Sequence, residues 1–83
     1  VPVIKLLSHL PVVVDPSHAT GKWGLVKPMT YAAVAAGCDG VMIEVHPDPE
    51  RAVSDGPQQL YPEHFVSMVE EMRRFAEAAG RTL

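Results

Sequence analysis

The sequence predicts an α/β protein with parallel strands that forms part of a larger domain. The apolar pattern indicates elements in the order helix, strand, helix, strand, helix. The two predicted strands are separated by roughly 28 residues, which fits one right-handed βαβ unit. Both strands are apolar on both faces, which is typical of buried parallel strands. Because two strands leave unpaired edges, we expect a complete domain to need more strands than this 83-residue chain supplies.

The first part of the chain is predicted to form a short helix and a buried strand. Residues 2–8 have a proline in the first turn and an apolar face, which favour a helix. Residues 10–15 carry three consecutive valines and are predicted to form a strand. Residues 15–27 contain a proline and two glycines, so this segment is predicted to be a loop.

The middle of the chain is predicted to form a second helix and a second strand. The helix covers roughly residues 28–36, with its start left open as far back as Trp23, and Gly37 favours its end. Residues 40–46, GVMIEVH, are predicted to form the second strand.

The last part is predicted to form a long polar loop and then an amphipathic helix. The loop covers residues 47–60, within which Asp48 and Pro49 favour one short helical turn. Residues 62–79 form the helix, and Gly80 ends it. Apolar residues recur there at steps of three and four: Phe65, Met68, Val69, Met72, Phe75 and Ala79.

Composition narrows the class of protein. The formal net charge of −3 does not favour binding to nucleic acid. No apolar run approaches the roughly 20 residues of a membrane span. The start, VPVIKLLSHL, lacks an initiator Met and the pattern of a signal peptide, so we expect a truncated N-terminus. Cys38 is the only cysteine, which excludes an internal disulfide and favours a cytoplasmic location.

Three side chains of metal-ligating type lie at or after the ends of the predicted strands. His18 follows the first strand in DPSH, Glu44 lies near the end of the second, and Asp55 stands in the SDGP of the next loop. Neighbouring parallel strands lie roughly 5 Å apart, so side chains at their ends can share one ion. An imidazole and two carboxylates suit manganese, iron, zinc or cobalt better than calcium. The pattern therefore indicates a divalent metal site.

Each candidate also has a simpler interpretation that the residues alone leave open. His18 fits an exposed loop histidine, and Glu44 fits a carboxylate at a strand end in solvent or in a salt bridge. Asp55, just before a glycine and a proline, fits a turn residue. Asp15 fits a residue that only accepts backbone hydrogen bonds.

Two further residues are predicted to lie outside the ligand set. His46 points to the same side as Glu44 if the strand persists, and it is interpreted as the polar end of that strand rather than a supporting group. Cys38 enters the second strand at the opposite end from His18, so it is predicted to be a small buried residue.

The segments DPSHATG and AAVAAGCDGVMIEVHPDPERAVSDGPQQL resemble the C-terminal part of the class-I DAHP synthase family. The related KDO 8-phosphate synthases have a histidine motif closer to D-A-T-H-S, so DPSHATG favours the DAHP enzymes. The resemblance implies a (β/α)8 TIM barrel, of which residues 1–83 are a C-terminal fragment. The fragment would supply the end of the sixth helix and then the seventh and eighth strands with their helices, and not a complete barrel.

The resemblance also implies an activity. The family joins phosphoenolpyruvate to erythrose 4-phosphate in an aldol-like condensation that opens the shikimate pathway to the aromatic amino acids. Its divalent metal is bound by Cys, His, Glu and Asp, and the last three match His18, Glu44 and Asp55. The family's cysteine lies near the first strand, so Cys38 does not match it. The substrate-phosphate motifs of earlier strands are absent as well.

The missing cysteine ligand and phosphate motifs lead to further expectations. The chain alone is expected to be inactive and to form a homo-oligomer or associate with the remaining barrel segments. Two alternatives are KDO 8-phosphate synthesis from arabinose 5-phosphate and a non-catalytic, self-associating fragment. Tyr61 stands where relatives often have a Thr that caps the last helix, and the change is expected to weaken that helix start by roughly 1 kcal/mol.

Overall fold

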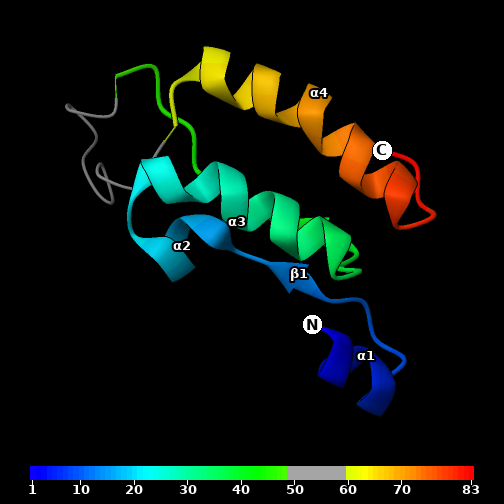
Figure 1. The fold of residues 1–83 in the computed structure, drawn as a ribbon. Coiled ribbons are helices and arrows are strands. Elements are labelled where there is room, and N and C mark those ends of the chain that lie inside the picture. Colours follow the sequence, from blue (N-terminus) through cyan, green and yellow to red (C-terminus); the bar gives the residue numbers. More distant parts are fainter. Residues whose placement is uncertain (49–59) are drawn as a thin grey trace.

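The computed structural model describes residues 1–48 and 60–83. Its elements are α1 (Pro2–Leu7), β1 (Val13–Val14), α2 (Pro16–Thr20), α3 (Trp23–Ala35), β2 (Gly40–Val41) and α4 (Pro62–Ala78). In Figure 1, α3 and α4 lie side by side and run in the same direction, while α1 projects away from them. The predicted order of helices and strands is confirmed, with α2 added to it.

The two strands pair in parallel, as predicted. Val13 lies opposite Gly40 and Val14 lies opposite Val41. The backbone N–H of Met42 donates to the carbonyl of Val14 at 2.9 Å and continues the ladder. The carboxyl ends of β1 and β2 therefore lie next to each other, which brings the segments that follow them together.

Both strands are shorter and more exposed than predicted. The ladder ends early because Asp15 accepts a hydrogen bond from α2 and the backbone of Glu44 donates one to α2. Val13 is 60% exposed and Met42 is 57% exposed, so the prediction that both faces are buried is wrong for this chain. In the described ranges these two strands pair only with each other, and α3 packs against β2.

The predicted loop after the first strand is wrong, because it contains α2 and the start of α3. The side chain of Asp15 caps α2 by accepting the backbone N–H of His18 at 3.0 Å, and Pro16 is the first helical residue. Gly21 ends α2 with φ of 65°, a left-handed conformation that favours glycine. The next helix begins at Trp23, the earlier of the two starts considered.

The core lies between α3 and α4. Val26, Leu60 and Met68 form it and are at most 2% exposed. Met72 and Ala76 continue the buried stripe of α4, so the predicted amphipathic helix is confirmed. None of the helices in residues 1–48 and 60–83 has the length and apolar character needed to cross a membrane.

Polar and aromatic contacts also join α3 to α4. The hydroxyl of Tyr31 donates to Glu71 at 2.7 Å, and Lys27 forms an ion pair with the same carboxylate at 3.0 Å. Burial, followed by the hydrogen bond to Glu71 and the charge of that carboxylate, raises the pKa of Tyr31 well above its usual value. The ring of Tyr31 stacks on Phe75 with centroids 4.5 Å apart. Tyr61 precedes α4 without a side-chain cap, as predicted.

Asp39 ties together three segments at the amino end of the sheet. Its carboxylate binds the ammonium of Lys5 at 2.7 Å, the backbone N–H of Val12 at 2.8 Å and the guanidinium of Arg81 at 3.1 Å. The hydrogen bond from Lys5 is the largest of the effects that lower the pKa of Asp39. This carboxylate therefore links α1, the residue just before β1 and the residues after α4.

Replacing Asp39 with asparagine is expected to lower the melting temperature at pH 7. Because the folded-state pKa of Asp39 lies below the unfolded value of about 3.9, its contribution is complete above that pH. The contribution is lost as the pH falls through the folded-state pKa. Melting curves of the wild type and Asp39→Asn should therefore differ at pH 7, and the difference should narrow as the pH falls below about 4. A difference independent of pH, or one equal to that of Glu70→Gln on the exposed face of α4, would contradict this role.

Candidate functional site

The structure brings together His18 and Glu44, two of the three predicted ligands. His18 lies on α2, just after β1, and Glu44 lies just after β2. The Nε2 atom of His18 is 2.8 Å from Oε1 of Glu44. The side chain of His18 is 51% exposed and that of Glu44 is 23% exposed, so solvent reaches the pair. The contact forms because the two parallel strands end at the same edge.

Asp15 holds the other side of the His18 ring. Its Oδ2 atom lies 2.5 Å from Nδ1 of His18, and its Oδ1 atom accepts the backbone N–H of the same residue at 3.0 Å. The backbone hydrogen bond is the main cause that lowers the pKa of Asp15, and the imidazole contributes as well. The interpretation of Asp15 as an acceptor of backbone hydrogen bonds alone is therefore incomplete.

Ser17 holds the backbone at Glu44. It is fully buried, and its hydroxyl accepts the backbone N–H of Glu44 at 3.1 Å. The short helix α2 thus fixes both halves of the pair, because His18 lies on it and Ser17 anchors the partner strand. Sequence reasoning missed Ser17, and its only signal was its place inside DPSH.

Of two other residues considered in the sequence, Asp55 and His46, the structure describes only His46. Asp55 lies outside the described residues, as does most of the short helical turn predicted to begin at Asp48. The Nδ1 atom of His46 accepts the backbone N–H of Asp48 at 2.9 Å, which is a local turn contact. This contact fits the interpretation of His46 as the polar end of the second strand.

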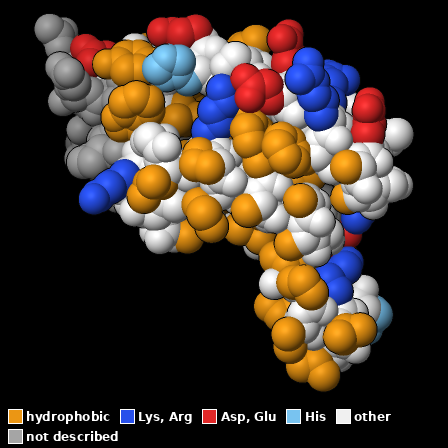
Figure 2. All heavy atoms as spheres, in the orientation of Figure 1, with side chains coloured by type: hydrophobic (Ala, Val, Ile, Leu, Met, Phe, Trp, Pro, Cys, Tyr) orange, Lys and Arg blue, Asp and Glu red, His pale blue; other side chains and the backbone are white. Residues whose placement is uncertain are grey.

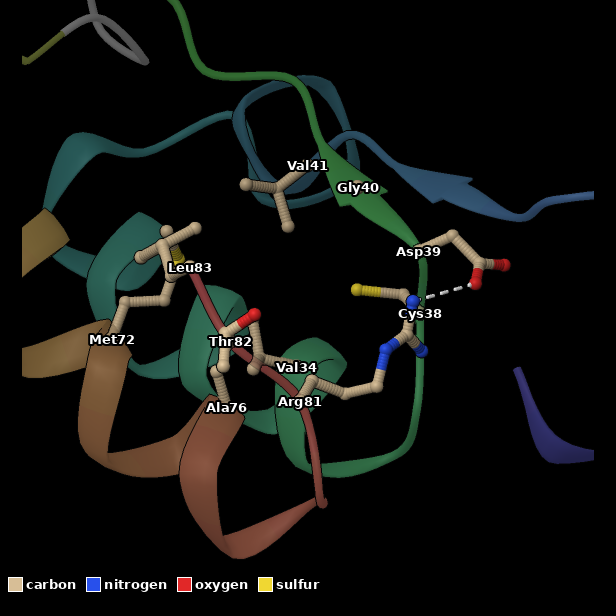
Figure 3. Close-up of a pocket in the computed structure, with 10 residues that line it drawn as sticks. All are labelled: Val34, Cys38, Asp39, Gly40, Val41, Met72, Ala76, Arg81, Thr82 and Leu83. Carbon is tan, nitrogen blue, oxygen red and sulfur yellow. Dashed lines mark hydrogen bonds and ion pairs between the residues drawn. The ribbon is translucent and has the colours of Figure 1, made fainter.

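Cys38 lies at the opposite end of the sheet, as predicted. It is 8% exposed, and burial raises the pKa of its thiol. Cys38 lines a cavity of about 90 Å³ together with Arg81 and Leu83. Figure 3 shows these side chains and the Arg81–Asp39 ion pair beside them. Cys38 is therefore a small buried residue with a neutral thiol, and it lies away from His18.

The His18–Glu44 pair fits one edge of a metal site in chemistry and in spacing. Two ligands bound about 2.1 Å from one ion, at a right angle, lie roughly 3 Å apart. The 2.8 Å between Nε2 and Oε1 is close to that value, and it is also an ordinary hydrogen-bond distance. Among residues 1–48 and 60–83, no three His, Cys, Asp or Glu side chains form a group that could hold a metal ion.

Comparison with known proteins identifies the family. Residues 1–79 match the model of the DAHP synthetase I family. The chain is 51% identical over 80 residues to phospho-2-dehydro-3-deoxyheptonate aldolase of Thermotoga maritima, covering 96% of this chain and 24% of the relative. It is 34% identical over 75 residues to 2-dehydro-3-deoxyphosphooctonate aldolase of Desulfotalea psychrophila, covering 77% of this chain and 25% of that relative.

The fold of a solved relative agrees. The truncated form of 3-deoxy-D-arabino-heptulosonate 7-phosphate synthase from Thermotoga maritima superposes with a TM-score of 0.86 at 51% identity. The match covers 90% of this chain and 29% of that structure. The chain thus spans about a quarter of the length of these curated relatives. On the family match and the two Thermotoga maritima comparisons, the chain belongs to the DAHP synthetase I family.

Proposed function

We propose that this chain supplies the metal-binding end of a DAHP synthase that joins phosphoenolpyruvate to erythrose 4-phosphate. The observation that carries the proposal is the 2.8 Å contact between His18 and Glu44. It lies at the carboxyl ends of parallel strands, where TIM-barrel enzymes place their chemistry. The two residues occupy the DPSH and MIEVH segments of a chain that matches the family over residues 1–79.

In this proposal His18, Glu44 and Asp55 bind a divalent ion such as manganese, iron, zinc or cobalt. When bound, such an ion supplies Lewis-acid polarisation of the aldehyde carbonyl of erythrose 4-phosphate. The protein's part is to keep the ligands in place before substrate arrives. Asp15 holds the ring of His18, and Ser17 holds the backbone of Glu44.

We further propose that the chain acts as the seventh and eighth strand–helix pairs of a barrel. The exposed Val13 of β1, the exposed Met42 just after β2 and the apolar surface of α1 support this, since further barrel segments or a second copy would cover them. Figure 2 shows apolar side chains gathered on the lobe that α1 forms. Apolar residues of and next to α1 that are more than half exposed are Val3, Ile4, Leu6, Leu7 and Leu10. A cytoplasmic location belongs to the same proposal.

A chimera tests the proposed reaction. This chain would replace the matching 80 residues of the Thermotoga maritima relative, and the product is called the Thermotoga chimera below. With manganese and erythrose 4-phosphate, the chimera should consume phosphoenolpyruvate, while the 83-residue chain alone should not. The chain alone lacks a cysteine ligand and the substrate-phosphate groups, and its net charge of −3 disfavours phosphorylated substrates.

Each alternative predicts another outcome. Consumption with arabinose 5-phosphate but not with erythrose 4-phosphate would favour the octonate reaction. A chimera that folds, as judged by circular dichroism, but turns over neither substrate would favour a non-catalytic fragment. Light scattering after size exclusion should find the chain alone in an associated state, because its strand edges and α1 are uncovered.

A further inference from the structure

We propose that Asp15 is a positioning residue that keeps a proton on Nδ1 of His18 and so leaves Nε2 to face Glu44 as a ligand atom. The inference rests on the metal role proposed above for His18. The placement of the proton is a separate claim, because it follows from contacts within the chain. Metal-binding histidines commonly donate their second ring N–H to a carboxylate, which fixes the tautomer and the ring orientation.

The geometry uses both oxygens of Asp15. Oδ1 accepts the backbone N–H of His18 at 3.0 Å, and Oδ2 lies 2.5 Å from Nδ1. An ionised carboxylate only accepts hydrogen bonds, so Nδ1 must carry the proton in this contact. A neutral imidazole has one N–H, so Nε2 then presents a lone pair.

That lone pair points toward another acceptor. Nε2 lies 2.8 Å from Oε1 of Glu44. Two acceptors at this distance attract each other only through a cation between them, either a proton or a metal ion. Asp15 therefore selects the tautomer of His18 in which Nε2 and Oε1 of Glu44 can bind the same cation.

The need for a helix cap does not by itself explain why residue 15 is an aspartate. The cap of α2 needs only Oδ1, and serine or asparagine provides an equivalent cap. The second contact, from Oδ2 to the ring, adds nothing to the cap. The two contacts can therefore be separated by substitution.

The substitutions Asp15→Asn and Asp15→Ser separate the contact that caps α2 from the contact with the His18 ring. An asparagine side chain has one acceptor, and when its oxygen keeps the cap its amide N–H₂ faces Nδ1. Nδ1 must then accept, the proton moves to Nε2, and the ligand atom is blocked. Serine keeps the cap but is too short to reach Nδ1, so neither tautomer is selected. Both variants remove the same charge, so the difference between them isolates the effect of the ring proton.

The test combines two measurements on the 83-residue chain. Two-dimensional ¹⁵N–¹H NMR of the ring at pH 8 should find a proton on Nδ1 of His18 in the wild type and on Nε2 alone in Asp15→Asn. In a titration with Zn²⁺ alone, Asp15→Asn should weaken binding by about 10- to 100-fold. Asp15→Ser should weaken it less, with a helical signal equal to that of Asp15→Asn.

The outcomes distinguish the two claims. A wild-type Nδ1 without a proton, or equal Zn²⁺ affinities for the asparagine and serine variants, would overturn the role of Asp15. If Nδ1 carries the proton as expected but Zn²⁺ shifts no signal of His18 or Glu44, the proposed metal role fails while the orientation by Asp15 stands.

Discussion

Replacing Glu44 with alanine in the Thermotoga chimera is expected to lower metal-dependent turnover by about 10³-fold, because several kcal/mol of Lewis-acid stabilisation depends on the ion staying in place. Glu44 supplies one of the two donor atoms that the structure places 2.8 Å apart. After this substitution, His18 is the one donor side chain of the pair that remains. The rate of phosphoenolpyruvate consumption at saturating manganese measures the effect.

The matched control is Glu70→Ala. Glu70 is also a glutamate, but it lies on the exposed side of α4. Its replacement should leave the rate within about twofold of the starting chimera, because exposed substitutions away from a site usually change stability by no more than about 0.5 kcal/mol and so leave the folded fraction nearly unchanged. Equal rates for the Glu44 and Glu70 variants would remove Glu44 from the site.

Replacing Met68 with alanine is expected to destabilise the 83-residue chain by about 2–5 kcal/mol. Met68 is fully buried and packs in the cluster with Val26 and Leu60. The substitution removes apolar contacts and leaves a cavity between α3 and α4. A small domain has only about 5–15 kcal/mol of stability in total, so most of the folded population is at risk. Equilibrium unfolding in urea measures the change.

Met42→Ala is the matched control for this second prediction. Met42 follows β2 and is 57% exposed, so the same substitution there should cost much less. Equal losses of stability at the two positions would show that the core does not lie where Met68 packs. The loss at Met68 also bears on the site, because Leu60 pairs its backbone with that of Glu44 at 3.0 Å.

Long periodic elements were predictable from the sequence, and short capped ones were not. The predicted helix over 62–79 agrees with α4 within one residue, because its apolar stripe repeats over several turns. The five-residue helix α2 has no such repeat. Its signals were the cap at Asp15, the proline after it and Gly21, and the same residue types also favour a loop.

The same difference between long-range pattern and short local turns explains which contacts of the site could be predicted from the sequence. Residue types at the ends of two parallel strands sufficed to predict that His18 and Glu44 meet. The contacts of Asp15 and Ser17 depend on the turn that α2 makes after β1, and a loop at that place gives no reason to expect them. The strands end early because of the same α2 contacts, and the exposure of Val13 could not be predicted from an apolar run alone.

The most direct test of the account measures phosphoenolpyruvate consumption by the Thermotoga chimera, with erythrose 4-phosphate, before and after a chelator removes divalent metal. Consumption is expected to stop in the chelator-treated protein and to return when manganese is added back. No such return is expected in a His18→Ala chimera that still folds. Consumption that continues unchanged after chelation would contradict the claim that His18 and Glu44 form a metal site.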